Sequence, residues 1–208
     1  MKLRIATISA LLCIAAIVPA SAQIHFGAVA GLNFSTLSFD PEDFSTSTKT
    51  GFQIGAVLSK QMSEEFTIVV EPMYASRGAT GTDDEDGLEI VMTVIELPIL
   101  FRYSFGTGDI RPYAVAGPEL GFISSPKVKS TDGENEEDVD DILKNMDFGL
   151  TFGAGATKPI GKNTLFGELR YTVGMANLND DSDFEDGSIK SSGIQLLFGI
   201  VFGTQTGM

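Results

Sequence analysis

Residues 88–104 read LEIVMTVIELPILFRYS, and this stretch decides the fold class. Side chains of a β-strand point alternately to its two faces, so the stretch can be divided into two sets. The odd positions from Val91 to Tyr103 carry only Val, Thr, Ile, Leu, Phe and Tyr. The opposite face carries Glu96 and Arg102. The stretch therefore predicts a long strand with one apolar face and one face that holds charged side chains.

The same alternation recurs in segments of about ten residues or more, separated by stretches rich in turn-forming residues. Beyond the first residues of the chain, no window shows a sustained helical period, and no apolar run is long enough for a membrane helix. We therefore expect an all-β chain. Its eight strands are predicted at 24–34, 51–60, 65–77, 88–104, 110–123, 147–157, 164–176 and 189–202.

The connections between the predicted strands alternate in length. Short connections lie at 61–64, 105–109 and 159–163, and the last two contain turn-forming glycines. Long, polar and acidic connections lie at 35–50, 78–87, 124–146 and 177–188. Short turns at one end and long loops at the other are typical of bacterial outer-membrane barrels. The predicted fold is an eight-stranded antiparallel up-and-down transmembrane β-barrel, with short periplasmic turns and long acidic extracellular loops.

The polar strand faces are expected to line the lumen, and the apolar faces to contact lipid. A soluble barrel would carry Lys along its strands, whereas the lysines beyond residue 22 fall in loops, in turns or near strand ends. The polar faces instead hold Gly and a matched set of Glu and Arg. An unpaired buried charge costs several kcal/mol, so a narrow lumen requires such pairing. The expected lumen ionic network comprises Glu71, Arg77, Glu96, Arg102, Arg111, Glu119, Glu168 and Arg170.

The first residues are expected to form an export signal. Lys2 and Arg4 precede an apolar stretch at 5–18, and residues 20–22 read Ala-Ser-Ala. This order of basic, apolar and small residues is typical of a secretory signal peptide. We predict a signal peptide at 1–22, cleaved after Ala22, and an outer-membrane barrel domain at 23–208. The one cysteine of the chain lies in the signal, so the mature chain is expected to have none.

The composition excludes several classes of function. The formal net charge is −14 and the pI is near 4.3, whereas nucleic-acid binding needs a basic face. One His and one Cys leave no room for most catalytic triads and zinc sites. His25 is expected to be an ordinary residue near the periplasmic rim. The chain is not expected to be an enzyme, and no catalytic residue, cofactor or metal ligand is predicted.

Three acidic clusters, at 83–86, 134–141 and 180–186, carry the surplus of negative charge. Their carboxylates suit divalent cations only weakly. The segment 181–187 departs from a calcium-hand loop, because its glycine comes one position late and Ser192 stands where the terminal Glu belongs. We expect solvated loops, with a diffuse divalent-cation contact as the weaker alternative. Outer-membrane lipid is the expected partner, and the sequence identifies no protein partner.

Two runs in the middle of the chain are similar to a known family. Residues 111–121, RPYAVAGPELG, resemble the "RPY…AGP.LG" strand of the PorT-like outer-membrane β-barrel family. Residues 95–103, IELPILFRY, resemble its "E-(I/L)-P-(I/L)-L" run, and residues 26–33, FGAVAGLN, resemble its "G.K.G.N.S" start. The resemblance implies an integral outer-membrane barrel of a Bacteroidetes-type lineage. The member that names the family belongs to a protein-secretion system, but the shared residues build a barrel and identify no transport site.

The sequence thus predicts a non-enzymatic outer-membrane barrel with a structural, secretion-associated or surface-interaction role. An eight-stranded barrel is wide enough only for its own side chains or one small ligand, so the Glu and Arg side chains are expected to plug the lumen. Two alternatives stay open. A small pore or transporter would need continuous water through the lumen, and a soluble lipocalin-like barrel would turn its apolar faces inward.

Overall fold

The computed structural model describes residues 24–40, 46–81, 88–130, 136–138, 146–178 and 188–203. The expected signal peptide at 1–22 lies outside the described residues and stays a prediction. No helix in the described part of the chain has the length and apolarity needed to cross a membrane. The strands are β1 (Ile24–Asp40), β2 (Thr46–Gln61), β3 (Phe66–Val70), β4 (Met73–Gly81), β5 (Leu88–Ser104), β6 (Arg111–Ser130), β7 (Glu136–Asp138), β8 (Met146–Ile160), β9 (Asn163–Gly174) and β10 (Ser188–Val201).

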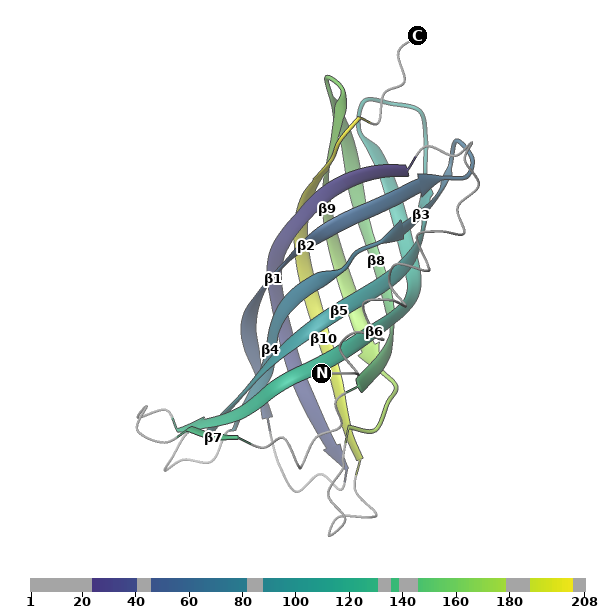
Figure 1. The fold of residues 1–208 in the computed structure, drawn as a ribbon. Helices are drawn as coiled ribbons and strands as arrows, with labels where there is room; N and C mark the ends of the chain where they lie inside the picture. The colour runs from purple at the N-terminus through teal and green to yellow at the C-terminus, as the bar shows by residue number, and fades with distance from the viewer. Residues whose placement is uncertain are drawn as a thin grey trace, which may run out of the picture.

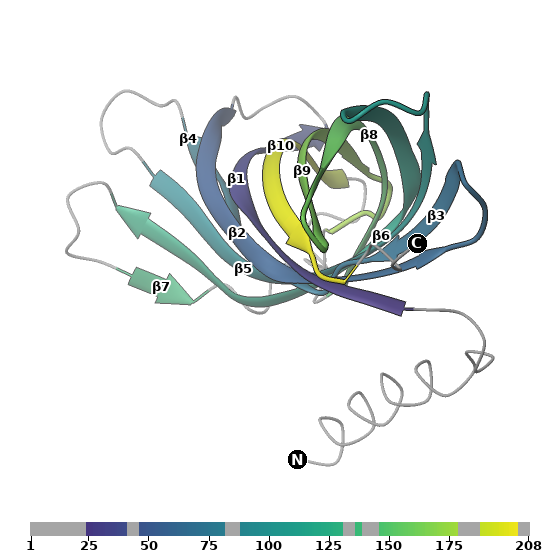
Figure 2. The same ribbon diagram turned by 90° about the horizontal axis from the view of Figure 1, so that it is seen from above.

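The strands form one closed antiparallel sheet, which Figure 1 shows from the side and Figure 2 from above. Closure follows from β1, which pairs with β2 on one side and with β10 on the other. β3 and β4 follow one another along a single position between β2 and β5, and the short β7 pairs only with the end of β6. The wall therefore has eight strands, as predicted: β1, β2, β3–β4, β5, β6, β8, β9 and β10.

Two prolines account for the break between β3 and β4. The register with β2 is unchanged across the break, since Val70 lies opposite Leu58 and Met73 lies opposite Gly55. Pro72 accepts a backbone hydrogen bond from β2, and Pro98 of β5 accepts one from Glu71, each at 3.1 Å. Neither proline has an N–H to return, so each ladder loses one bond at this point. β3 and β4 are thus two halves of one wall strand.

The strands continue further toward the long-loop end than the sequence predicted. Parts of the connections predicted at 35–50, 78–87 and 124–146 are strand instead. Backbone pairing continues until Asp40 lies opposite Ser188, Thr46 opposite Gly81, and Leu88 opposite Ser130. Polar composition there did not indicate the end of a strand. In Figures 1 and 2, β4, β5, β6 and β7 extend away from the barrel at this end. The acidic clusters at 83–86 and 180–186, and most of 134–141, lie outside the described residues.

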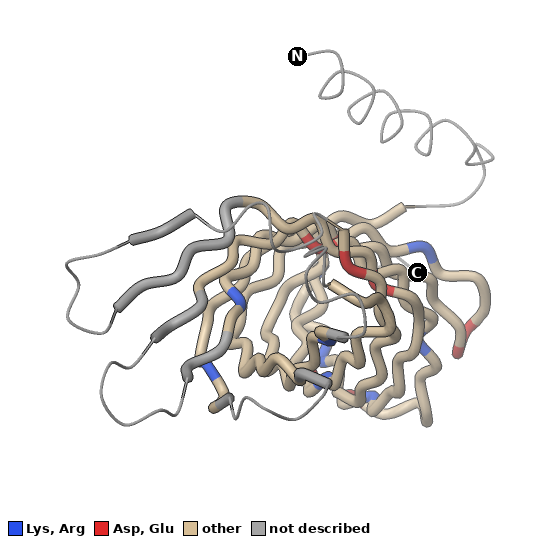
Figure 3. The backbone as a smooth tube through the Cα atoms, turned by 90° about the horizontal axis from the view of Figure 1, so that it is seen from below, with Lys and Arg blue, Asp and Glu red and all other residues tan. Residues whose placement is uncertain are grey.

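The two faces of the wall differ as the alternation predicted. Exposed large apolar side chains lie on seven of the eight wall strands, all but β6, and several are more than half exposed, such as Phe26 at 61%, Ile54 at 57% and Phe198 at 62%. Charged positions are sparse along the barrel wall in Figure 3. A belt of exposed apolar side chains around most of the barrel is far larger than the patches that soluble proteins tolerate. The outer face is therefore suited to lipid rather than to water.

Candidate functional site

The middle of the lumen is filled by charged side chains from the inward faces of the strands. Alternation places them there, because each occupies a position whose neighbours along the strand point outward to lipid. Seven of the eight residues predicted for the ionic network are buried in the lumen, with at most 6% exposure. They are Glu71, Arg77, Glu96, Arg102, Glu119, Glu168 and Arg170.

One part of this network joins opposite walls of the barrel. Arg170 lies on β9, and Glu71 lies between β3 and β4, four wall positions away in an eight-stranded barrel. Nη2 of Arg170 is 2.6 Å from Oε2 of Glu71, and Nε of Arg170 pairs with Glu168 on its own strand. Glu168 also faces Arg102 of β5, with 3.6 Å between Oε2 and Nη2. The lumen is therefore crossed by side chains along its full diameter.

A second part of the network joins β4, β5, β6, β8 and β9. Arg77 places Nε 2.5 Å from Oε1 of Glu96 and Nη2 2.6 Å from Oε1 of Glu119. The other oxygen of Glu119 accepts hydrogen bonds from the hydroxyls of Thr151, at 2.8 Å, and Thr172, at 3.2 Å. Charge-assisted hydrogen bonds of this kind are roughly twice as strong as neutral ones. Arg77 and Thr172 reach Glu119 from strands that are not neighbours of β6, whereas Arg77 reaches Glu96 from the adjacent strand.

Apolar side chains also fill the lumen, and the sequence analysis did not single them out. One cluster lies toward the short-turn end and includes Val57, Leu100 and Leu197; another lies toward the long-loop end and includes Leu37 and Ile123. Their signal was present in the sequence, because they share the parity of the buried polar or charged residues on their strands. The lumen is thus closed by an ionic layer between two apolar clusters.

The eighth predicted residue, Arg111, lies apart from the network, at the short-turn end. Its Nε donates to the backbone carbonyl of Gly106 at 3.2 Å. Its position faces inward as predicted, but it is the first residue of β6 and is therefore too far along the barrel axis to reach the central carboxylates. Parity fixes the face of a strand but not the depth at which a side chain sits.

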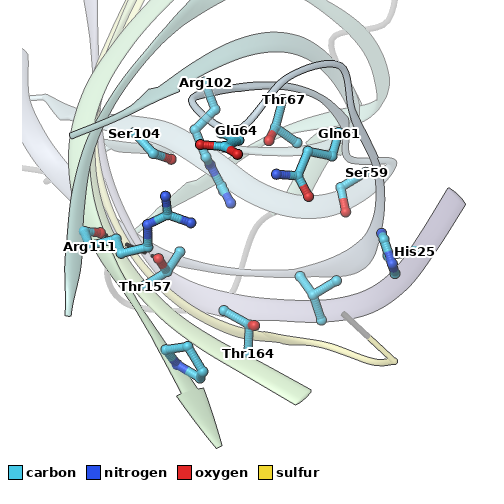
Figure 4. A pocket seen from close by; sticks show the side chains of 12 residues that line it. His25, Ser59, Gln61, Glu64, Thr67, Arg102, Ser104, Arg111, Thr157 and Thr164 are labelled. Atoms are coloured by element: carbon cyan, nitrogen blue, oxygen red, sulfur yellow. Dashed lines mark hydrogen bonds between the residues drawn. The ribbon is translucent and has the colours of Figure 1, made fainter. Parts of the chain in front are cut away.

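Arg111 lines a cavity of about 280 Å³ at this end of the lumen. Figure 4 shows the cavity from close by, with side chains from β1, β2, β3, β5, β6, β8 and β9 around it. His25 lies at its edge, near the rim as expected from the sequence. Within the described residues, no group of His, Cys, Asp and Glu is arranged to hold a metal ion.

A closed antiparallel barrel with an apolar outer face and a charged lumen defines an integral β-barrel membrane protein. The family model described as outer membrane protein beta-barrel domain matches residues 19–180, which is most of the chain. The protein belongs to this family.

Solved structures with the same architecture come from other bacterial outer-membrane proteins. Outer membrane protein OprG from Pseudomonas aeruginosa is similar with a TM-score of 0.56 and 10% identity, over 87% of this chain and 97% of OprG. Neisserial surface protein A is similar with a TM-score of 0.49 and 13% identity, over 86% of this chain and 96% of that protein. The likeness to OprG shows the fold alone. The comparison with curated proteins gave no match.

Proposed function

We propose that this chain is an exported outer-membrane protein with a closed lumen that acts through its two ends, in a structural, secretion-associated or surface-interaction role. The observation that carries the proposal is the ion pair between Arg170 and Glu71, which lie on opposite walls. Breaking a buried pair costs about 3–5 kcal/mol, so the lumen does not open by thermal motion of one side chain. Passage of a molecule through the lumen would require this ionic network to rearrange.

Family membership supports the outer membrane as the location, and the signal peptide predicted at 1–22 supports export. In that location the short turns face the periplasm and the long acidic loops face the outside. The runs at 95–103 and 111–121 fall on β5 and β6, which are paired, and they support the narrower PorT-like assignment. Diffuse divalent cations at the acidic loops, bridging to anionic lipid, belong to the same proposal.

The alternative with a specific structural requirement is a small pore. A pore needs a continuous water path, and both apolar clusters and the ionic layer stand across that path. A soluble lipocalin-like barrel would need apolar side chains inside and charged ones outside. The observed faces have the opposite arrangement, since Glu71 and Glu96 are fully buried and Phe198 is 62% exposed.

The location and orientation are tested with single-cysteine variants, because the mature chain is predicted to lack cysteine. Ser63→Cys places a thiol in the turn between β2 and β3, and Asp181→Cys places one in a long connection. We expect a membrane-impermeant maleimide to label Asp181→Cys on intact cells, and Ser63→Cys only after the outer membrane is permeabilised. Wild type is the blank. The reverse pattern, or recovery of the protein in the soluble fraction, would contradict the proposal.

The closed lumen is tested by osmotic swelling of proteoliposomes in a small sugar. We expect vesicles that carry the folded mature protein to swell no faster than empty vesicles. Swelling that increases with the amount of folded protein would favour the pore instead. A heat-dependent shift on a gel confirms that the barrel in each preparation is folded.

A further inference from the structure

The cavity at the short-turn end is a space that neither lipid contact nor closure of the lumen explains. Its volume of about 280 Å³ lies just below the range of about 300–1,000 Å³ that is usual for small-molecule sites. Polar side chains from seven wall strands surround it, and the apolar side chain of Val201 contributes to its wall. The cavity is open to solvent at the short-turn end and blocked further in by the ionic network.

Two arginines line this cavity, and both have unused capacity to donate hydrogen bonds or to attract charge. Arg102 is 6% exposed, and its guanidinium lies 4.2 Å from the ring centre of Tyr113. Its Nη2 is 3.6 Å from Glu168, which is longer than a hydrogen bond. The described residues offer no hydrogen-bond acceptor to Nε and Nη2 of Arg102. Arg111 uses its Nε on Gly106, and Figure 4 shows both guanidinium groups turned toward the same space.

Neutral groups complete the lining. Ser59, Thr67 and Ser104 contribute hydroxyls, and Nε2 of His25 is buried with no hydrogen-bond partner among the described residues. Glu64 is the one acidic residue of the lining, and it is exposed on the turn after β2, where water screens its charge. Because Arg102 is buried, its charge acts in a lower dielectric than that of Glu64. Glu168, behind the lining, offsets part of the Arg102 charge, and Arg111 adds a second positive charge to the cavity. The cavity therefore favours negative charge.

We propose that this cavity binds a small molecule that carries a carboxylate or phosphate group, with Arg102 and Arg111 as its principal ligands. A guanidinium presents a planar set of donors that matches the oxygens of either group, and partial burial strengthens the contact. Hydroxyls at the wall supply donors for the remaining oxygens. The proposal does not depend on the closed lumen, because the ligand enters and leaves at the short-turn end.

The test is isothermal titration calorimetry of the mature protein, folded in a zwitterionic detergent, with inorganic phosphate and separately with succinate. Ionic strength is held constant. We expect saturable one-site binding of at least one probe, and the probe that binds identifies the recognised group. Absence of saturable heat with both probes in the wild-type protein would overturn the proposal.

Three charge variants make the result specific to the cavity. Arg111→Gln lies outside the ionic network, and it should weaken binding by about tenfold to a hundredfold, as expected for loss of a charged hydrogen bond. Glu64→Gln should tighten binding, because it removes the negative charge from the lining. Lys162→Gln removes a positive charge from a turn at the same end but outside the lining, and it should leave binding unchanged. Equal losses in Arg111→Gln and Lys162→Gln would overturn the proposal.

A steric variant covers the case in which a charge change disturbs folding. Ser104→Phe fills the cavity and keeps every charge, so we expect it to abolish binding while the heat-dependent gel shift stays intact. Unchanged affinity in folded Ser104→Phe would show that the anion binds elsewhere and would overturn the proposal.

Discussion

Arg170 shows how one buried side chain can join opposite walls of the barrel. Its side chain is fully buried, and it pairs with Glu71 from the opposite wall and with Glu168 from its own strand. Exposed ion pairs contribute about 0–1 kcal/mol, because water screens the charges. Removal of Arg170 would instead leave two carboxylates in a low-dielectric interior without their main partner. The stability of the barrel is therefore expected to depend on this residue.

We predict that Arg170→Ala lowers the free energy of unfolding by about 3–5 kcal/mol, as expected when a buried pair loses one partner. Asp109→Ala, in the exposed turn between β5 and β6, should change it by less than about 0.5 kcal/mol. Urea unfolding midpoints of both variants, measured in the same micelles, give the comparison. Equal midpoints for the two variants would contradict the role of the network.

Gly155 shows that the lumen is also limited by volume. A Cβ at this position of β8 would clash with the backbone oxygen of Gly167 and would lie 2.6 Å from Cζ and from the hydroxyl oxygen of Tyr113. We predict that Gly155→Ala destabilises the barrel by about 1–3 kcal/mol through overpacking. Ala154→Val is the matched control, because it adds volume at the exposed neighbouring position that faces outward. If both variants unfold at the same urea concentration, the lumen is less tightly filled than the structure indicates.

At the scale of the strands, alternation predicted the two faces of the wall and the number of wall strands, and the structure confirms both. The ends of the strands were harder to predict. The polar ends of β1 and β6 keep their backbone pairing as far as Asp40 and Ser130, because a ladder needs backbone groups and not apolar side chains. Likewise, one wall strand is divided into β3 and β4. Pro72 and Pro98 have no backbone N–H, so the two adjacent ladders each lose one hydrogen bond there.

The contact of the strands with lipid leads to a prediction at this scale. Leu169 of β9 and Ile110 of the turn before β6 are similarly exposed, at 56% and 60%. We predict that Leu169→Arg destabilises the barrel in liposomes by about 2–4 kcal/mol, because it places a charge in hydrocarbon. Ile110→Arg should have an effect below about 0.5 kcal/mol, because the turn lies in water. Equal effects in liposome-based unfolding would contradict an outer face embedded in lipid.

At the scale of the whole molecule, the barrel is closed by layers along its axis. The sequence predicted that Glu and Arg would meet in the lumen, but not which of them would meet. The partner of Arg170 depends on strand tilt and register around the whole barrel, which bring β9 and the β3–β4 junction opposite each other. The same geometry leaves Arg111 at one end, beside a cavity that no local sequence pattern indicates. Leu100 and Leu197 were not predicted as lumen residues, because each is an apolar side chain on a face that otherwise carries charged or polar residues.

The central claim is that the lumen is closed, and single-channel recording tests it most directly. The mature protein is folded in detergent, checked by its heat-dependent gel shift, and inserted into a planar bilayer. We predict no conductance steps from the wild-type protein, and none from a Glu71→Ala/Arg170→Ala double variant, because the apolar clusters on both sides of the ionic layer remain in place. Reproducible steps from the wild-type protein, reshaped by changes at Arg102 or Glu96, would contradict the claim and make the ionic network the filter of a pore.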